Sequence, residues 1–94
     1  SVGENVYVTS NSSAAPDSAV APWADEARHY NYERNRCALG QVCGHYTQLV
    51  WRDTSRVGCG AMACGSVSGF GGRSGLLVVC NYAPAGNFVG HRPY

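Results

Sequence analysis

Two stretches in the second half of the chain carry the clearest β-strand pattern. Residues 75–82 form a nearly continuous apolar run, which is typical of a buried strand. Residues 56–64 hold small and β-branched side chains and predict a second strand. A glycine-rich segment, residues 65–74, joins the two. The pattern therefore predicts an antiparallel hairpin with a long loop.

Helical spacing marks residues 22–33. Trp23, Glu26 and Tyr30 recur at intervals of three and four, so they share one face of the predicted helix. Pro22 suits the first helical turn, where a backbone N–H has no partner within the helix. Glu26 stands out on this face, because it places a carboxylate beside two aromatic rings.

The other segments predict loops and one short helix. Residues 1–22 are mostly small and polar, and residues 10–13 within them predict a loop; Asn11-Ser12-Ser13 is also a sequon for N-glycosylation. Residues 34–44 hold two cysteines and end in glycine, which indicates a loop closed on itself. Residues 45–51 favour a short helix, although their β-branched and aromatic residues also allow a strand. The tail, residues 84–94, is rich in turn-forming residues.

The composition narrows the function classes. A chain of 94 residues allows one domain, and its apolar content of 45% can fill a small core. A net charge of +1 argues against a nucleic-acid binder, which needs a basic face. No apolar run approaches the roughly 20 residues of a membrane helix. We therefore expect a small monomeric domain.

Five cysteines predict disulfides and an oxidising compartment. Cys37 and Cys43 can close a small loop, and Cys59 and Cys80 would face each other across the predicted hairpin. Cys64 is left over. It is either a buried free thiol or a residue whose partner lies upstream of the chain. The cysteine spacings do not match a zinc knuckle, and no thiol has an evident activating base nearby.

Four ordered motifs lie at residues 3–6, 23–26, 44–51 and 79–88. The third reads Gly-His-Tyr-Thr-Gln-Leu-Val-Trp, and the fourth reads Val-Cys-Asn-Tyr-Ala-Pro-Ala-Gly-Asn-Phe. Together they resemble signatures of the superfamily of cysteine-rich secretory, antigen 5 and pathogenesis-related 1 (CAP, or SCP) proteins. The ending, residues 87–94, is similar to the plant pathogenesis-related 1 branch. The resemblance covers essentially the whole chain.

The resemblance implies an α+β fold, an α-β-α sandwich around an antiparallel sheet. It also implies an earlier helix and a histidine motif upstream, so residues 1–94 are identified as the C-terminal two-thirds of one domain, N-terminally truncated. The family's bridges agree with Cys37–Cys43 and Cys59–Cys80, and they give Cys64 a partner in the missing part. Without the first helix we expect one face of the sheet to lack its cover and to expose apolar strand surface.

The family has a cleft lined by two histidines and two glutamates. By motif, Glu4, Glu26 and His45 match three of these residues, and the second histidine would lie upstream. Nitrogen and oxygen donors of this kind suit zinc or another divalent metal, and a metal-dependent hydrolase is the alternative function. The other interpretation is structural: Glu4 caps backbone N–H groups, and Glu26 bonds His45 and fixes its tautomer. No nucleophile accompanies the cluster.

The resemblance implies a secreted, non-enzymatic plant defence protein of the apoplast or vacuole with an antifungal role. Its expected partners are a sterol or related lipid and the pathogen surface or its membrane lipids. Tyr30 and Tyr32 are candidates for a surface contact, whereas Trp51 is expected in the core. The segment Pro84–Tyr94 resembles a releasable C-terminal defence peptide; otherwise it packs as an ordinary extension. A third possibility is a disulfide-stapled interaction module.

Overall fold

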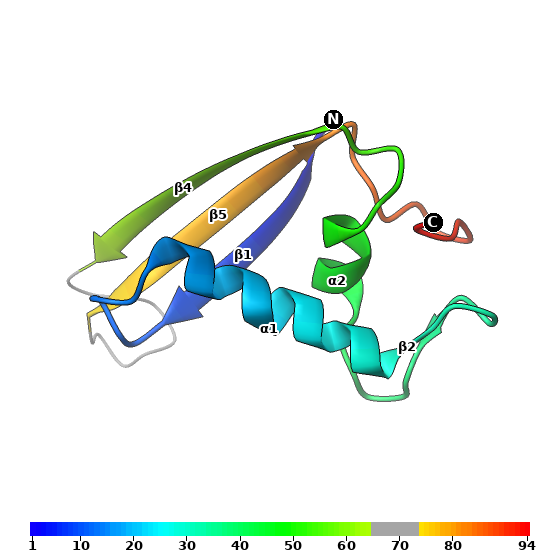
Figure 1. The fold of residues 1–94 in the computed structure, drawn as a ribbon, viewed down its shortest axis with the longest axis horizontal. Coiled ribbons are helices and arrows are strands. Elements are labelled where there is room, and N and C mark those ends of the chain that lie inside the picture. The colour runs from blue at the N-terminus through cyan, green and yellow to red at the C-terminus, as the bar shows by residue number, and fades with distance from the viewer. Residues whose placement is uncertain (65–73) are drawn as a thin grey trace.

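A three-stranded antiparallel sheet is the centre of the computed structural model, which describes residues 1–64 and 74–94 (Figure 1). Strands β4 (Arg56–Cys64) and β5 (Gly75–Ala83) form the predicted hairpin. Strand β1 (Gly3–Thr9) pairs with the other edge of β5, which gives the order β1-β5-β4. The glycine-rich loop expected between β4 and β5 falls almost wholly on residues 65–73, outside the described residues.

Strand β1 is an element that the sequence did not predict, and the loop predicted at residues 10–13 follows directly after it. Residues 5–9 read Asn-Val-Tyr-Val-Thr, and β-branched and aromatic side chains suit a pleated surface. The partner strand lies near the other end of the chain, with Gly3 opposite Tyr82 and Thr9 opposite Leu76. The local sequence does not reveal such a distant pairing, because whether residues 3–9 form a strand depends on the strand with which they hydrogen-bond.

A continuous helical run follows β1. It consists of η1 (Pro16–Ala19), α1 (Val20–Asp25) and η2 (Glu26–His29), in which η denotes a 3-10 helix. The run therefore begins and ends earlier than the predicted 22–33. Pro16 rather than Pro22 opens it, since a proline loses no helical hydrogen bond in the first turn. At Tyr30 the backbone becomes extended and the helix ends.

A small hairpin and the second helix complete the fold. Strands β2 (Tyr30–Asn31) and β3 (Arg36–Cys37) pair, and the 37–43 disulfide closes the loop that follows β3. Helix α2 (Gly44–Leu49) confirms the helix predicted for residues 45–51, with slightly different ends. The β2–β3 hairpin lies at the far end of the helical run from the sheet (Figure 1).

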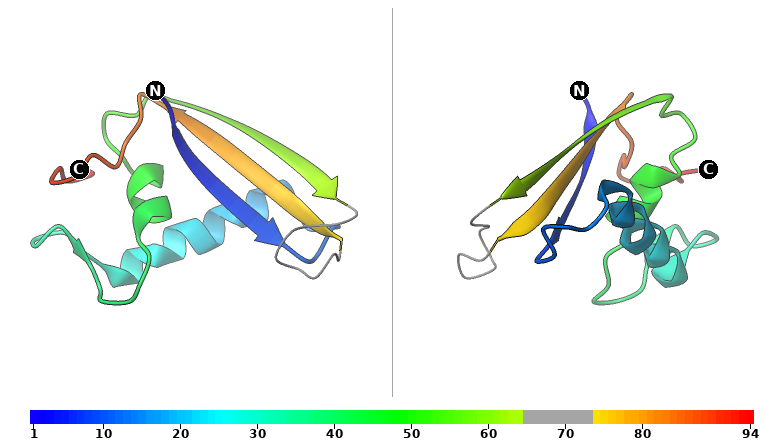
Figure 2. Two further views of the ribbon diagram at one scale, coloured as in Figure 1. Left: turned by 180° about the vertical axis from the view of Figure 1, so that it is seen from behind. Right: turned by 60° about the vertical axis from the view of Figure 1, so that its left-hand side comes forward.

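The described helices lie on one face of the sheet (Figure 2). The core forms where this layer meets β5, and Trp23 is its largest member, with 3% of its surface exposed. The indole Nε1–H of Trp23 also donates to the carbonyl of Val6 at 3.4 Å, which ties α1 to β1. The other buried core residues are Ala19, Leu76, Val78, Cys80 and Tyr82. This arrangement confirms the α+β class.

The opposite face of the sheet carries no helix among the described residues. Because side chains alternate along a strand, Val6 and Met62 belong to this face. They are 39% and 66% exposed, respectively. The bare apolar face that the sequence led us to expect is therefore present.

Both disulfides proposed from spacing form, at 2.05 Å for Cys37–Cys43 and 2.07 Å for Cys59–Cys80. Cys64 is half-buried and unpaired. Disulfides of this kind fit an oxidising, extracellular compartment. In the described ranges, no helix is both long and apolar enough to cross a membrane.

Candidate functional site

Glu26 and His45 form a close pair where η2 meets the start of α2. The Nδ1 of His45 lies 2.7 Å from Oε2 of Glu26. Because a carboxylate only accepts hydrogen bonds, Nδ1 carries the hydrogen of this bond, and the other ring nitrogen, Nε2, takes no part in it. The imidazole also stacks on the ring of Trp23, with centroids 6.3 Å apart. The predicted contact between Glu26 and His45 is therefore present, in a geometry that fixes the tautomer.

The second carboxylate oxygen of Glu26 caps helix α2. The backbone N–H of Tyr46 donates to Oε1 at 3.0 Å. The N-cap residue of α2, Cys43, offers no side-chain cap of its own. Glu26 thus satisfies one of the free N–H groups at the start of this helix from outside the helix. One side chain holds both the histidine and the helix that presents it.

Asn5 connects this pair to the sheet. It is 2% exposed, and its amide nitrogen donates at 3.1 Å to both the carbonyl of His45 and the hydroxyl of Tyr82. Burial raises the pKa of Tyr82, and the hydrogen bond from Asn5 partly opposes this. Asn5 was not among the predicted site residues, although an asparagine inside a β-branched run was a usable signal.

Glu4 lies on the other face of β1. Side chains alternate along a strand, so Glu4 and Asn5 point to opposite faces. Glu4 accepts a hydrogen bond of 3.3 Å from Asn81 instead of capping backbone N–H groups. The structure therefore joins two of the three predicted cleft residues, and Glu4 is not with them.

The described residues bring together no complete set of ligands for a divalent metal. Both carboxylate oxygens of Glu26 already accept hydrogen bonds, one from His45 and one from Tyr46. No group of three or more His, Cys, Asp or Glu side chains is placed to hold a metal among residues 1–64 and 74–94. Metal binding at Glu4, Glu26 and His45 stays a prediction, and no reaction step is derived from it.

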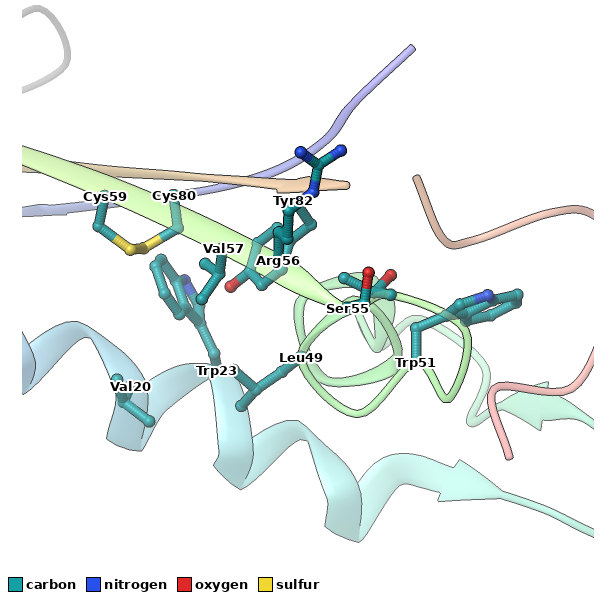
Figure 3. Close-up of a pocket in the computed structure, with 11 residues that line it drawn as sticks. Val20, Trp23, Leu49, Trp51, Ser55, Arg56, Val57, Cys59, Cys80 and Tyr82 are labelled. Carbon is teal, nitrogen blue, oxygen red and sulfur yellow. A yellow bond between two sulfur atoms is a disulfide. The ribbon is translucent and has the colours of Figure 1, made fainter. Parts of the chain in front are cut away.

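An apolar groove runs between α1 and the edge strand β4. It consists of two adjoining hollows of about 330 and 460 Å³, which share Val20, Trp23 and the 59–80 disulfide as walls. Figure 3 shows Trp23 and Leu49 on the helical side and the disulfide, Val57 and Tyr82 on the strands. Ligand pockets in proteins typically measure about 300–1,000 Å³ and are mostly apolar. The groove has the size and chemistry of a site for an apolar ligand.

The first half of the C-terminal tail is fixed to α2. The amide of Asn87 donates to the carbonyl of Gly44 at 2.9 Å, and its oxygen accepts from the hydroxyl of Thr47 at 2.6 Å. The backbone N–H of Gly86 donates to the buried side chain of Gln48 at 2.9 Å. These bonds hold the tail against the helix that follows the 37–43 loop.

The last residues of the tail pack on the β2–β3 hairpin. The rings of Tyr94 and Tyr32 stack with centroids 5.1 Å apart, and the guanidinium of Arg92 lies 5.5 Å from the Tyr32 ring centre. The hydroxyls of Tyr94 and Tyr46 are 2.8 Å apart. This hydrogen bond, followed by burial, raises the pKa of Tyr46 from its usual 10 to about 12. The candidate contact residue Tyr32 is thus engaged with the chain's own tail.

The comparisons place these features in a family. The family model described as "Cysteine-rich secretory protein family" (CAP) matches residues 2–82. The chain belongs to the CAP family. Its pair at Glu26 and His45, both disulfides and all of its sheet except Ala83 lie within the matched range.

Several CAP relatives match along nearly all of this chain. Pathogenesis-related protein PR-1 of Medicago truncatula is 44% identical over 98% of the chain, and pathogenesis-related protein 1B of Nicotiana tabacum is 45% identical over 98%. GLIPR1-like protein 1 of Mus musculus is 43% identical over 99%. The chain covers 50%, 51% and 37% of these proteins, so it spans about half the length of the plant relatives.

A solved CAP structure confirms the fold. The crystal structure of Na-ASP-1 aligns with a TM-score of 0.75 at 27% identity, over 99% of this chain and 24% of that one. The chain is therefore a CAP protein similar to pathogenesis-related 1 proteins, as the motifs indicated.

Asn11 lies on an exposed turn between β1 and η1. Its side-chain oxygen accepts the backbone N–H of Ser13 at 3.1 Å. The sequon is thus at the surface, where a glycan could be attached. Glycosylation of Asn11 stays a prediction.

Proposed function

We propose that the chain is part of a secreted defence protein of the pathogenesis-related 1 kind, acting in the apoplast or vacuole. Its proposed action is to bind a sterol or related lipid of a pathogen membrane in the groove between α1 and β4. The proposed outcome is an antifungal effect without catalysis. The apolar groove is the observation that carries this proposal.

The groove supports a lipid ligand by its walls. The indole of Trp23, the side chain of Leu49 and the 59–80 disulfide offer flat apolar surface (Figure 3). Val57 lines the same groove and remains 60% exposed, so its surface is available to a ligand. Burying apolar area is worth about 25 cal/mol per Å², which a sterol skeleton can exploit.

The test is a sterol-binding assay on the full-length protein with ergosterol and a plant sterol. Val57→Asp places a charge on the groove wall and should abolish binding, because the carboxylate must be desolvated. Leu39→Asp is the matched control, since Leu39 is fully exposed in a loop away from the groove. Equal binding by both variants, or no binding by the unmodified protein, refutes the lipid proposal. The unmodified protein would also fail to bind sterol if another part of the full-length chain filled the groove.

We also propose that the tail, Pro84–Tyr94, is a peptide precursor, cut between Ala83 and Pro84. The position of this segment outside the sheet supports this role, because proteolysis concentrates at exposed segments without regular structure. The contacts of Asn87, Arg92 and Tyr94 imply that a cut tail stays bound to the folded domain. Release therefore needs both the cut and the loss of these contacts.

Mass spectrometry of wounded source tissue tests the release. The expected product is the free peptide Pro84–Tyr94, and its absence contradicts the precursor role. Cutting the folded protein in vitro and filtering it under native conditions tests the retention. The peptide should co-elute with the domain and separate from it in denaturant.

A metal-dependent hydrolase is not favoured by the described residues. Glu4 lies apart from Glu26 and His45, and no group of three or more His, Cys, Asp or Glu side chains is placed to hold a metal within the described ranges. The pair serves to position α2. Unchanged folding of His45→Ala together with loss of a hydrolytic activity that the unmodified protein has would contradict this assignment.

A further inference from the structure

A separate pocket of about 380 Å³ lies between η2 and the β2–β3 hairpin. The elements that line it lie at the end of the helical run that points away from the sheet (Figure 1). Three arginines line it, whereas the groove has one. The lining residues are Arg28, His29, Tyr30, Asn31, Arg34, Arg36, Cys37 and Ala38.

The backbone around this pocket is held in place. Tyr30 of β2 pairs with Cys37 of β3, and the Cys37–Cys43 disulfide holds β3 in place. The backbone N–H of Ala38 donates to the carbonyl of His29 at 2.7 Å, which joins the hairpin to η2. A rigid frame of this kind lowers the entropy cost of presenting side chains to a ligand.

The arginines that line the pocket come from both the hairpin and the helical run. The side chain of Asn31 accepts the backbone N–H of Arg34 at 3.0 Å, and Asn35 adopts a positive φ of 51°. This left-handed residue reverses the chain between Arg34 and Arg36. Arg28 comes from η2 on the facing side.

The charge of the pocket is unbalanced. Three of the chain's seven basic side chains line it, while the whole chain carries only +1. No Asp or Glu lines the pocket, and none of its arginines forms an ion pair with a carboxylate in the described part of the chain. By contrast, Arg52 lies 3.7 Å from Asp53. The positive charge of the pocket is thus available to bind an anion.

We infer that this pocket binds a phosphate monoester through Arg28, Arg34 and Arg36. A guanidinium matches phosphate oxygens with two parallel N–H donors, and several arginines suit a dianion better than a single carboxylate. The pocket is larger than one phosphate needs, so it has room for a sugar or inositol ring. The monoester can belong to a soluble phosphate or to a lipid headgroup. The inference is independent of the lipid groove and of the tail.

The test compares Arg34→Gln with Arg52→Gln in the intact chain. Each variant removes one exposed positive charge, but Arg34 lines the pocket and Arg52 does not. NMR titrations with inorganic phosphate and inositol trisphosphate give the dissociation constants. Losing one charge-assisted hydrogen bond should weaken inositol trisphosphate binding about tenfold for Arg34→Gln and leave Arg52→Gln unchanged.

Vesicles identify the source of the monoester. Phosphatidylcholine vesicles containing phosphatidylinositol 4-phosphate carry it, and charge-matched vesicles with phosphatidylserine do not. Binding of soluble probes alone supports a free phosphate compound, and preference for the first vesicles supports a headgroup. No binding of any probe overturns the inference. So does equal weakening by both variants or equal binding to both vesicle types, because either indicates non-specific attraction.

Discussion

The double contact of Glu26 gives a sharp prediction for Glu26→Ala. The variant removes the partner of His45 Nδ1 and the cap of the Tyr46 N–H together. Losing a helix cap costs about 0.5–2 kcal/mol, and a hydrogen bond to a charged group is worth about 1.5–3 kcal/mol. The side chain of His45 is 36% exposed, so water replaces part of the second term. We expect a loss of about 2–4 kcal/mol in the free energy of unfolding.

The expected loss is a large fraction of the free energy of unfolding of a domain of this size. Domains of this size are stable by about 5–15 kcal/mol, and each kcal/mol shifts the melting temperature of a domain of 60–100 residues by about 4–8 °C. Glu26→Ala should therefore lower the melting temperature by at least 8 °C on that scale. Urea unfolding monitored by the combined fluorescence of Trp23, which stacks on His45, and Trp51 measures the loss directly.

Two variants provide the controls. Glu26→Gln keeps an acceptor for the Tyr46 N–H but removes the charge, so it should cost about half as much as Glu26→Ala. Glu33→Ala removes an exposed carboxylate whose side chain makes no hydrogen bond within the described residues, and should cost under about 0.5 kcal/mol. If Glu26→Ala and Glu33→Ala are equally stable, Glu26 does not hold α2 and the reasoning fails.

Two further predictions concern the tail. Gly86→Ala should lower the free energy of unfolding by about 1–3 kcal/mol, because a Cβ there would lie 2.7 Å from Cγ of Trp51. Gly58→Ala is the control: its Cβ would lie in open space, so the same denaturation assay should show almost no change. Tyr46 should ionise near pH 12 in a phenolate absorbance titration, and Tyr46→Phe should remove that step. Since the pKa of Tyr46 is higher folded than unfolded, its contribution is complete below pH 10 and is lost as the pH rises toward 12.

The sequence by itself determined the β4–β5 hairpin and the two disulfides. Cys59 and Cys80 lie at equal distances from the middle of one loop, and strands joined by that loop must place them opposite each other. It also determined that Glu26 is unusual, since a carboxylate between aromatic positions of a helix needs a partner. These conclusions rest on short-range patterns, in which neighbours along the chain decide the outcome.

Only the tertiary structure decided which groups meet across the chain. β1 is a strand because β5 has a free edge with which it can pair. The register of that pairing decides which face of the sheet each side chain is on, so Asn5 points toward His45 and Glu4 points away from it. The tail's attachment to α2 and the basic pocket at the β2–β3 hairpin have the same origin. Side-chain direction in a strand depends on register, and register depends on a partner that the local sequence does not contain.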